Sequence, residues 1–184
     1  MKATGIVRRI DELGRIVVPK EIRRTLRLRE GDPLEIFTDR DGGVILKKYS
    51  AIRELTNFAS EYSESLHQTI GNIILICDRD NIISVSGTTK KEYLEKKVSA
   101  DLEKMMEDRK SFVSEGVVKK AIALFEDEEI EGKYLDQIIS PILAQGDVIG
   151  AVIIITKEQG KKFTQMELKL AETAASFIGK QIEC

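Results

Sequence analysis

The first fifty residues alternate between short apolar stretches and turn residues, and this pattern predicts a small module of strands with one short helix. Ile22 and Leu26 lie one helical turn apart and would form the buried stripe of a helix over residues 20–26. Pro19 suits the first position of that helix, because the N–H group that proline lacks would have no partner there. The strands are expected at residues 4–10, 16–18, 33–38 and 44–48.

From residue 51 onward the apolar positions predict a second domain of helices and strands. Apolar residues recur with a period of 3.6 from Ile52 to Ile70, which indicates a helix over residues 51–70 that would link the two domains. The expected fold class is α+β with two domains, residues 1–50 and 51–184. Further strands are expected at 72–77, 82–86, 137–143 and 148–156, short helices at 91–97 and 99–109, and a last helix after the capping box that begins at Thr164.

Charge is divided unevenly between these domains. Residues 2–29 contain nine basic and three acidic residues, an excess of six positive charges, whereas the whole chain has a formal net charge of −2, so the remaining residues carry −8. A basic segment attached to an acidic body is typical of proteins that bind a polyanion, most often nucleic acid. On the predicted helix, Arg23 and Arg27 are four residues apart, and like charges at this spacing cost about 0.2–0.5 kcal/mol. This repulsion in a short helix favours a function in binding.

The small size of the first domain has a consequence for assembly. A segment of about fifty residues buries too little apolar surface to be secure alone, and this one contains no cysteine that could form a disulfide or a metal site. We therefore expect an obligate homodimer in which strands from two chains complete one small barrel.

The segment KATGIVRRIDELGRIVVPKEIRRTLRLREGDPLEIF, followed by ILKKY, resembles the DNA-binding domain of the AbrB family of bacterial transition-state regulators over residues 1–50. The motifs GIVR, DELGR, VVP and IRRTL stand in register with that family. The resemblance implies a swapped-hairpin β-barrel dimer that binds double-stranded DNA through a basic face and often reads DNA shape more than a fixed base sequence. It places the main DNA-contacting residues at Arg8, Arg15, Arg23 and Arg24, and charge alone adds Lys2, Arg9 and Arg27 as secondary candidates.

The segments ILICDRDNIISVSG and SPILAQGDVIGAVIIIT resemble the central strands of GAF domains, an α/β sensor fold. Two roles stay open for this domain. It binds a small-molecule effector of unknown identity, or it mainly mediates oligomerisation and pairs dimers into a homotetramer through its first and last helices. The combination of both domains is similar to that of transcription regulators of endospore-forming bacteria, which implies activation or repression of promoters in late sporulation.

Other classes of function have little support in the sequence. Cys77 and Cys184 lack CxxC spacing and His67 is the only histidine, so we expect no metal, no cofactor and no catalytic constellation, and hence no enzyme. Two such thiols suit a reducing cytoplasm, and no apolar run reaches the roughly 18 residues of a membrane span. The acidic run at residues 127–129 is interpreted as a solvated loop.

The main alternative is a MazE-like antitoxin, which shares the swapped-hairpin domain and binds both DNA and a toxin partner. Antitoxins of this type end in short, disordered tails. Because residues 51–184 carry apolar periodicity throughout, the sequence favours the transcription regulator.

Overall fold

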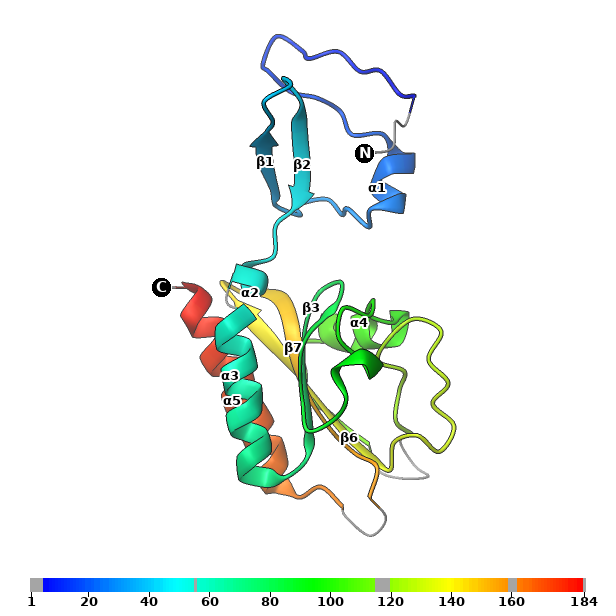
Figure 1. Cartoon of the computed structure of the whole chain (residues 1–184), viewed down its shortest axis with the longest axis vertical. Helices are drawn as coiled ribbons and strands as arrows, with labels where there is room; N and C mark the ends of the chain where they lie inside the picture. The colour runs from blue at the N-terminus through cyan, green and yellow to red at the C-terminus, as the bar shows by residue number, and fades with distance from the viewer. Residues whose placement is uncertain (1–4, 55, 115–119, 159–161, 184) are drawn as a thin grey trace. The chain divides into compact units, whose positions relative to one another are not determined.

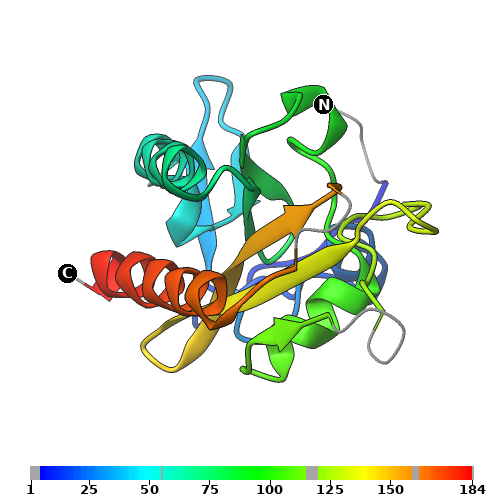
Figure 2. The same cartoon turned by 90° about the horizontal axis from the view of Figure 1, so that it is seen from below.

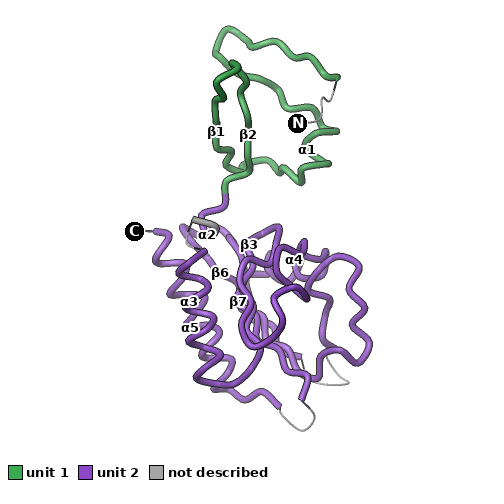
Figure 3. The backbone as a smooth tube through the Cα atoms, in the orientation of Figure 1, with its two compact units in different colours: residues 1–49 green, residues 50–184 purple. Residues whose placement is uncertain are grey.

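The computed structural model describes residues 5–54, 56–114, 120–158 and 162–183 (Figure 1). The chain separates into two compact units, residues 1–49 and 50–184 (Figure 3). The first unit has a two-stranded sheet and the second a five-stranded sheet. Both sheets are antiparallel, so short turns can join consecutive strands.

The C-terminal unit is built on its five-stranded sheet, whose strand order is β4-β3-β7-β6-β5. The longest pairing is the hairpin of β6 and β7. Strand β7 also pairs with β3 on its other side, so the apolar centres of these three strands lie next to one another. The strands are β3 (Ile73–Asp78), β4 (Ile82–Ser86), β5 (Phe112–Val113), β6 (Asp136–Ala144) and β7 (Asp147–Thr156).

Both faces of this sheet are covered, as Figure 2 shows. On one face lie α3 (Thr56–Ile70) and α5 (Gln165–Glu183), and on the other lies α4 (Ala100–Glu107) with its adjoining loops. Ile74 and Ile76 of β3 belong to the core under α3 and α5, whereas Leu75 and Cys77 belong to the core under α4. Because successive strand residues point to opposite faces, a strand that is covered on both sides is apolar at most of its successive positions.

The segment that enters this unit is fastened to the sheet. The hydroxyl of Ser50 donates a hydrogen bond to Asp78 Oδ2 at 3.1 Å, and Ile52 of α2 (Ala51–Glu54) is fully buried. Gly150 of β7 leaves the room for this contact, since a Cβ atom there would lie 2.7 Å from Ile52 Cδ1 and 2.0 Å from the carbonyl oxygen of Cys77. The start of the unit is therefore held against β3 and β7.

Most of the predicted elements in this unit are present with slightly shifted bounds, and two differ. Residues 91–97 contain only the 3-10 turn η1 (Lys90–Glu92). Their backbone bonds to β4 instead, because the N–H of Glu95 donates to the carbonyl of Ile82 at 2.8 Å and the N–H of Ile82 to the carbonyl of Lys96 at 3.0 Å. The two-residue strand β5 is absent from the sequence prediction, since so short an element gives no periodicity.

The N-terminal unit contains α1 (Lys20–Thr25) and a hairpin of β1 (Leu34–Thr38) and β2 (Val44–Lys48). The hairpin agrees with the prediction. Strands were also expected at residues 16–18 and 4–10, but residues 5–19 belong to no sheet in the described part of the chain. A strand needs a neighbouring strand for its N–H and C=O groups, and none of the strands in the described residues pairs with this segment.

Ser99 caps α4 and should stabilise the C-terminal unit. Its hydroxyl accepts a hydrogen bond from the N–H of Leu102 at 3.0 Å and donates one to the carbonyl of Ala123 at 2.6 Å. We expect Ser99→Ala to lower the free energy of unfolding by about 1–2 kcal/mol in urea denaturation, because both bonds are lost at a buried position. Ser65→Ala, at an exposed position of α3, is the control and should change it by less than about 0.5 kcal/mol. Equal effects would contradict the capping role.

Candidate nucleic-acid interface

A tight turn at residues 11–15 positions Arg15. The carboxylate of Asp11 accepts hydrogen bonds from the N–H groups of Leu13 at 3.0 Å and Arg15 at 2.8 Å, and the N–H of Asp11 donates to the carbonyl of Arg15 at 3.0 Å. Gly14 has a φ of 76°, a conformation that glycine adopts without steric cost. The guanidinium of Arg15 pairs with Asp11, Nε to Oδ2 at 2.7 Å, while most of its side chain stays exposed.

Helix α1 presents two further candidates. The carbonyl of Pro19 accepts a hydrogen bond from the N–H of Arg23 at 3.0 Å, so the helix begins next to the proline as the sequence indicates. None of its residues is buried, and Arg23 and Arg24 are exposed. The predicted buried stripe is incomplete in the single chain, because Ile22 is half-buried and Leu26 is exposed. A helix of this length depends on packing for its stability.

The remaining candidates differ in their surroundings. Arg8 and Arg9 are exposed in the segment before the turn, and Arg8 Nη1 donates to the preceding carbonyl at 3.2 Å. Arg27 is half-buried just after α1 with a φ of 51°, and its carbonyl accepts a hydrogen bond from Lys48 Nζ at 3.2 Å. Lys2 lies outside the described residues. The single chain therefore exposes all four main candidates, on residues 5–19 and on α1.

These basic segments belong to a unit that leaves much apolar surface uncovered. Among the described residues, ten large apolar side chains are exposed in the N-terminal unit and four in the C-terminal unit, although the latter is far longer. Ile36 pairs with Leu46 and Thr38 with Val44, so the exposed side chains Ile36, Val44 and Leu46 share one face, the apolar face of the hairpin. A surface of this kind indicates an interaction site.

The described residues offer little to other kinds of site. They contain no group of three or more His, Cys, Asp or Glu side chains that could hold a metal ion. No helix among them is long and apolar enough to cross a membrane. Cys77 is buried in the core, and burial raises the pKa of its thiol, so this cysteine is not activated as a nucleophile.

Comparison with known proteins identifies the family. Residues 54–183 match the family described as "Stage V sporulation protein T C-terminal, transcription factor". Stage V sporulation protein T of Bacillus subtilis is 53% identical to this chain over 183 residues, which are 100% of this chain and 99% of that protein. This chain belongs to the stage V sporulation protein T family.

The N-terminal part of this family member also has relatives of its own. It is 63% identical over 49 residues to the transition state regulatory protein AbrB of Bacillus subtilis, a match that covers 27% of this chain and 50% of that protein. Residues 7–54 match the family described as "Antidote-toxin recognition MazE, bacterial antitoxin". The AbrB resemblance seen in the sequence is thereby confirmed.

Two solved structures share the fold of the C-terminal unit. The GAF domain of Thermosynechococcus elongatus PixJ has a TM-score of 0.58 at 9% identity and covers 74% of this chain and 89% of that one. Residues 122 to 287 of a methyl-accepting chemotaxis protein have a TM-score of 0.58 at 15% identity, and the match covers 70% of this chain and 88% of that one. At this identity the likeness concerns the fold, and it confirms the expected GAF-like domain.

Sequence reasoning missed the part that Asp11 plays in the site. Its carboxylate organises the turn that carries Arg15, and the spacing D-x-L-G-R, an aspartate three residues before glycine, is the signal that could have indicated it. The N–H of Arg15, and then its guanidinium, lower the pKa of Asp11. A carboxylate with a lowered pKa stabilises the turn above its unfolded pKa, and this contribution is lost as the pH falls through the folded value.

We expect Arg15→Ala to raise the pKa of Asp11 only part of the way to its ordinary value, because the backbone N–H at position 15 remains in place. NMR titration of the Asp11 carboxyl carbon measures the change. Arg24→Ala removes an exposed arginine that does not contact Asp11 and should leave this pKa where it is. A complete return to the ordinary value in Arg15→Ala would show that the backbone contact is unimportant.

Proposed function

We propose that this protein is a DNA-binding transcription regulator of late sporulation, acting in the cytoplasm as activator or repressor according to the promoter. Its similarity to stage V sporulation protein T along the whole chain carries the proposal, and the exposed basic residues of the N-terminal unit agree with it. Phosphate contacts would supply most of the affinity, and a few groove contacts the selectivity. The residues in contact with DNA would be Arg8, Arg15, Arg23 and Arg24, with Lys2, Arg9 and Arg27 as secondary contacts.

The N-terminal unit would work as a swapped-hairpin homodimer. Residues 5–19 form no strand in the described part of the chain, and the apolar face of the hairpin is exposed. A second copy would provide both missing neighbours at once, because a twofold interface uses the same surfaces on each chain. Burying each Val, Leu or Ile side chain contributes about 1.5–3 kcal/mol, so the ten exposed apolar residues offer a strong drive to associate.

A second contact between copies would join dimers into a homotetramer. The rings of Phe58, Tyr62 and Phe177 lie together across α3 and α5, with centroids 5.6–5.9 Å apart, and Phe177 is exposed. A shallow groove of about 410 Å³ lies beside Phe177 on α5. A second copy of this face would cover both features. Two linked DNA-binding modules would then gain avidity on spaced sites.

The match of residues 7–54 to the MazE family favours the antitoxin as second candidate. Such a protein would need only the N-terminal module and a toxin-binding tail. The folded C-terminal unit and its match to the sporulation family over residues 54–183 support the regulator instead. A GAF-like domain also gives the regulator a place where a small-molecule effector could act.

Binding to promoter DNA across a salt series tests the function. We expect the affinity of the wild type for DNA to fall steeply with salt. Arg24→Ala should bind at least about tenfold more weakly. The slope of its logarithmic binding constant against the logarithm of salt concentration should be shallower by about one to two, since a dimer loses two phosphate contacts. Arg40→Ala removes the same charge from the exposed turn between β1 and β2 and is the matched control. Binding that ignores both salt and Arg24 would reject the DNA site.

Leu46 and Leu135 form a matched pair for testing the dimer, because each is 41% exposed in the single chain. Leu46→Glu should weaken the dimer by at least about 2 kcal/mol per protomer, since the side chain would be buried between copies. Leu135→Glu should have little effect. Calorimetry at several protein concentrations measures the result. The transition temperature of the N-terminal unit should rise with protein concentration in the wild type. At any one concentration it should be lower in Leu46→Glu than in the wild type. Equal tolerance of both substitutions would contradict the dimer.

A further inference from the structure

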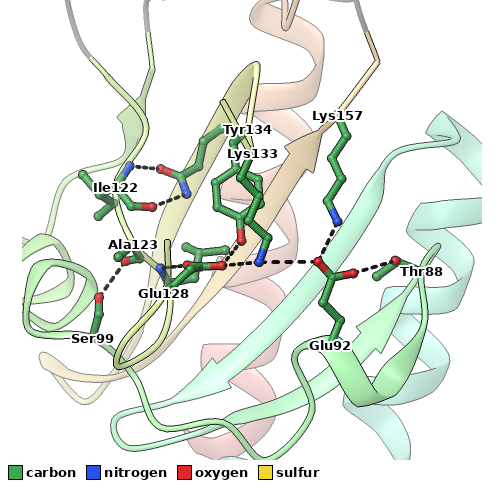
Figure 4. Close-up of polar contacts among 11 residues, drawn as sticks. Thr88, Glu92, Ser99, Ile122, Ala123, Glu128, Lys133, Tyr134 and Lys157 are labelled. Atoms are coloured by element: carbon green, nitrogen blue, oxygen red, sulfur yellow. Dashed lines mark hydrogen bonds and ion pairs between the residues drawn. The ribbon is translucent and has the colours of Figure 1, made fainter. Parts of the chain in front are cut away.

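Within the acidic run at residues 127–129, Asp127 and Glu129 are exposed, as the sequence interpretation expects, but Glu128 is not. The side chain of Glu128 is 0% exposed. Its Oε2 accepts a hydrogen bond from the N–H of Leu124 at 2.5 Å, and its Oε1 accepts from Lys133 Nζ at 2.8 Å and from the hydroxyl of Tyr134 (Figure 4). A buried carboxylate is tolerated only when it is paired and hydrogen-bonded in this way.

The ammonium group of Lys133 lies in a cage of aromatic rings and carboxylates. Besides Glu128, it forms an ion pair with Glu92 Oε1 at 3.4 Å. Its Nζ atom is 5.0, 4.9 and 5.5 Å from the ring centroids of Tyr93, Phe125 and Tyr134. All three rings are buried. Cations within about 6 Å of an aromatic centroid are attracted by the ring, more strongly where water is excluded.

The backbone that leads to Phe125 of this cage is fixed by side chains of β6, of the α4 cap and of Glu128. The amide of Gln137 bonds both the N–H of Ile122 at 2.9 Å and its carbonyl at 3.0 Å, Ser99 holds the carbonyl of Ala123, and Glu128 holds the N–H of Leu124 (Figure 4). Three successive backbone positions are thus set by polar contacts. The cage is preorganised, which lowers the cost of binding a ligand there.

The occupant, in contrast, comes from a surface turn. Lys133 belongs to no helix or strand, and it follows Gly132 in the turn at residues 131–133. Its side chain is 22% exposed, so the lysine is not sealed inside the unit. A lysine side chain has four rotatable methylene groups, and it can leave the cage while the turn keeps its place.

One buried hydroxyl in the cage makes no well-directed hydrogen bond. Tyr93 is 0% exposed, and its hydroxyl makes no hydrogen bond of acceptable geometry among the described residues, although Tyr134 and Glu92 are close enough to influence its titration. Burial raises the pKa of this hydroxyl, so it stays protonated and can donate. Buried hydroxyl groups usually make at least one well-directed hydrogen bond, so the Tyr93 hydroxyl has the capacity to donate to a further acceptor.

We propose that this cage is a binding site for a small primary organic ammonium ion, whose place is taken in this structure by the side chain of Lys133. The ligand would set its ammonium between Glu92 and Glu128 and offer a hydrogen-bond acceptor, such as a hydroxyl or ether oxygen, to Tyr93. One ammonium replaces another, so no proton is gained or lost. The proposal deepens the effector part of the proposed function, and its test uses no DNA, so either can fail without the other.

Two lysines lie at the edge of the cage, but the buried charge at its centre favours a cation over an anion. Lys157 Nζ pairs with Glu92 Oε1 at 2.7 Å from the outside, and Lys96 Nζ lies 3.8 Å from the ring centroid of Phe125. The innermost charged group is the carboxylate of Glu128, which is fully buried. Once Lys133 has left, this carboxylate needs a new cation, because an unpaired buried charge is strongly destabilising.

Chemical rescue tests the cage. Lys133→Ala should lower Tm, and n-butylammonium chloride, the analogue of a whole lysine side chain, should restore most of the loss with saturation. Neither n-butanol, which carries no charge, nor tetramethylammonium, which is a cation without an N–H donor, should restore it. Lys157→Ala, which removes the outer ammonium from Glu92, is the matched control and should show no saturable rescue. Lys133→Met keeps the cage filled and should also resist rescue. Absence of saturable rescue in Lys133→Ala would overturn the proposal.

Displacement in the wild type separates a binding site from a structural ion pair. The ¹⁵N-detected signal of the Lys133 ammonium should disappear with saturation as n-butylammonium is added, at a concentration at least about tenfold above that needed in Lys133→Ala, because the ligand competes with a tethered group. This experiment also decides the matter if Lys133→Ala fails to fold. A Lys133 signal that persists at all amine concentrations would show a purely structural lysine and overturn the proposal.

Discussion

Burial of apolar side chains governs both units of this chain, and the two units achieve it differently. In the C-terminal unit, the strands β3, β6 and β7 are covered on both faces, so isoleucine and valine at successive positions all find neighbours within the chain. In the N-terminal unit the described residues leave Ile36, Val44 and Leu46 exposed on one face. The proposed dimer supplies their missing neighbours, and the proposed DNA-binding function depends on that association.

Assembly and DNA binding are linked by this constraint. Arg8 and Arg15 lie on residues 5–19, which have no sheet partner in the described chain, and Arg23 and Arg24 lie on a helix with no buried residue. Closing the proposed barrel would order both segments before DNA arrives, which reduces the entropy lost on binding. The like-charge repulsion on α1 would be offset in the same complex by phosphate groups. A sensor domain that altered the assembly would therefore alter affinity for DNA.

Much of the fold could be predicted from periodicity, and the exceptions have physical reasons. The strands at 44–48 and 82–86 were located correctly, because alternating or continuous apolar runs depend only on local residues. Residues 91–97 were misread, since their backbone bonds to β4 outweigh helix propensity. Glu128 was taken for a solvated residue, because no local pattern shows that Lys133 and Tyr134 return to meet it. The arginine candidates came from charge and family resemblance, and only the exposure of the described ones is visible in the single chain.

Amide hydrogen exchange in the intact protein tests the central claim most directly. The N–H of Val17 donates no hydrogen bond within the described chain, whereas the ladder of β1 and β2 forms within it. If a second copy completes the barrel, the Val17 amide should exchange at least about a thousandfold more slowly than in an unstructured peptide. Exchange of Val17 at the peptide rate, under conditions in which the hairpin amides are protected, would contradict the dimer and the account built on it.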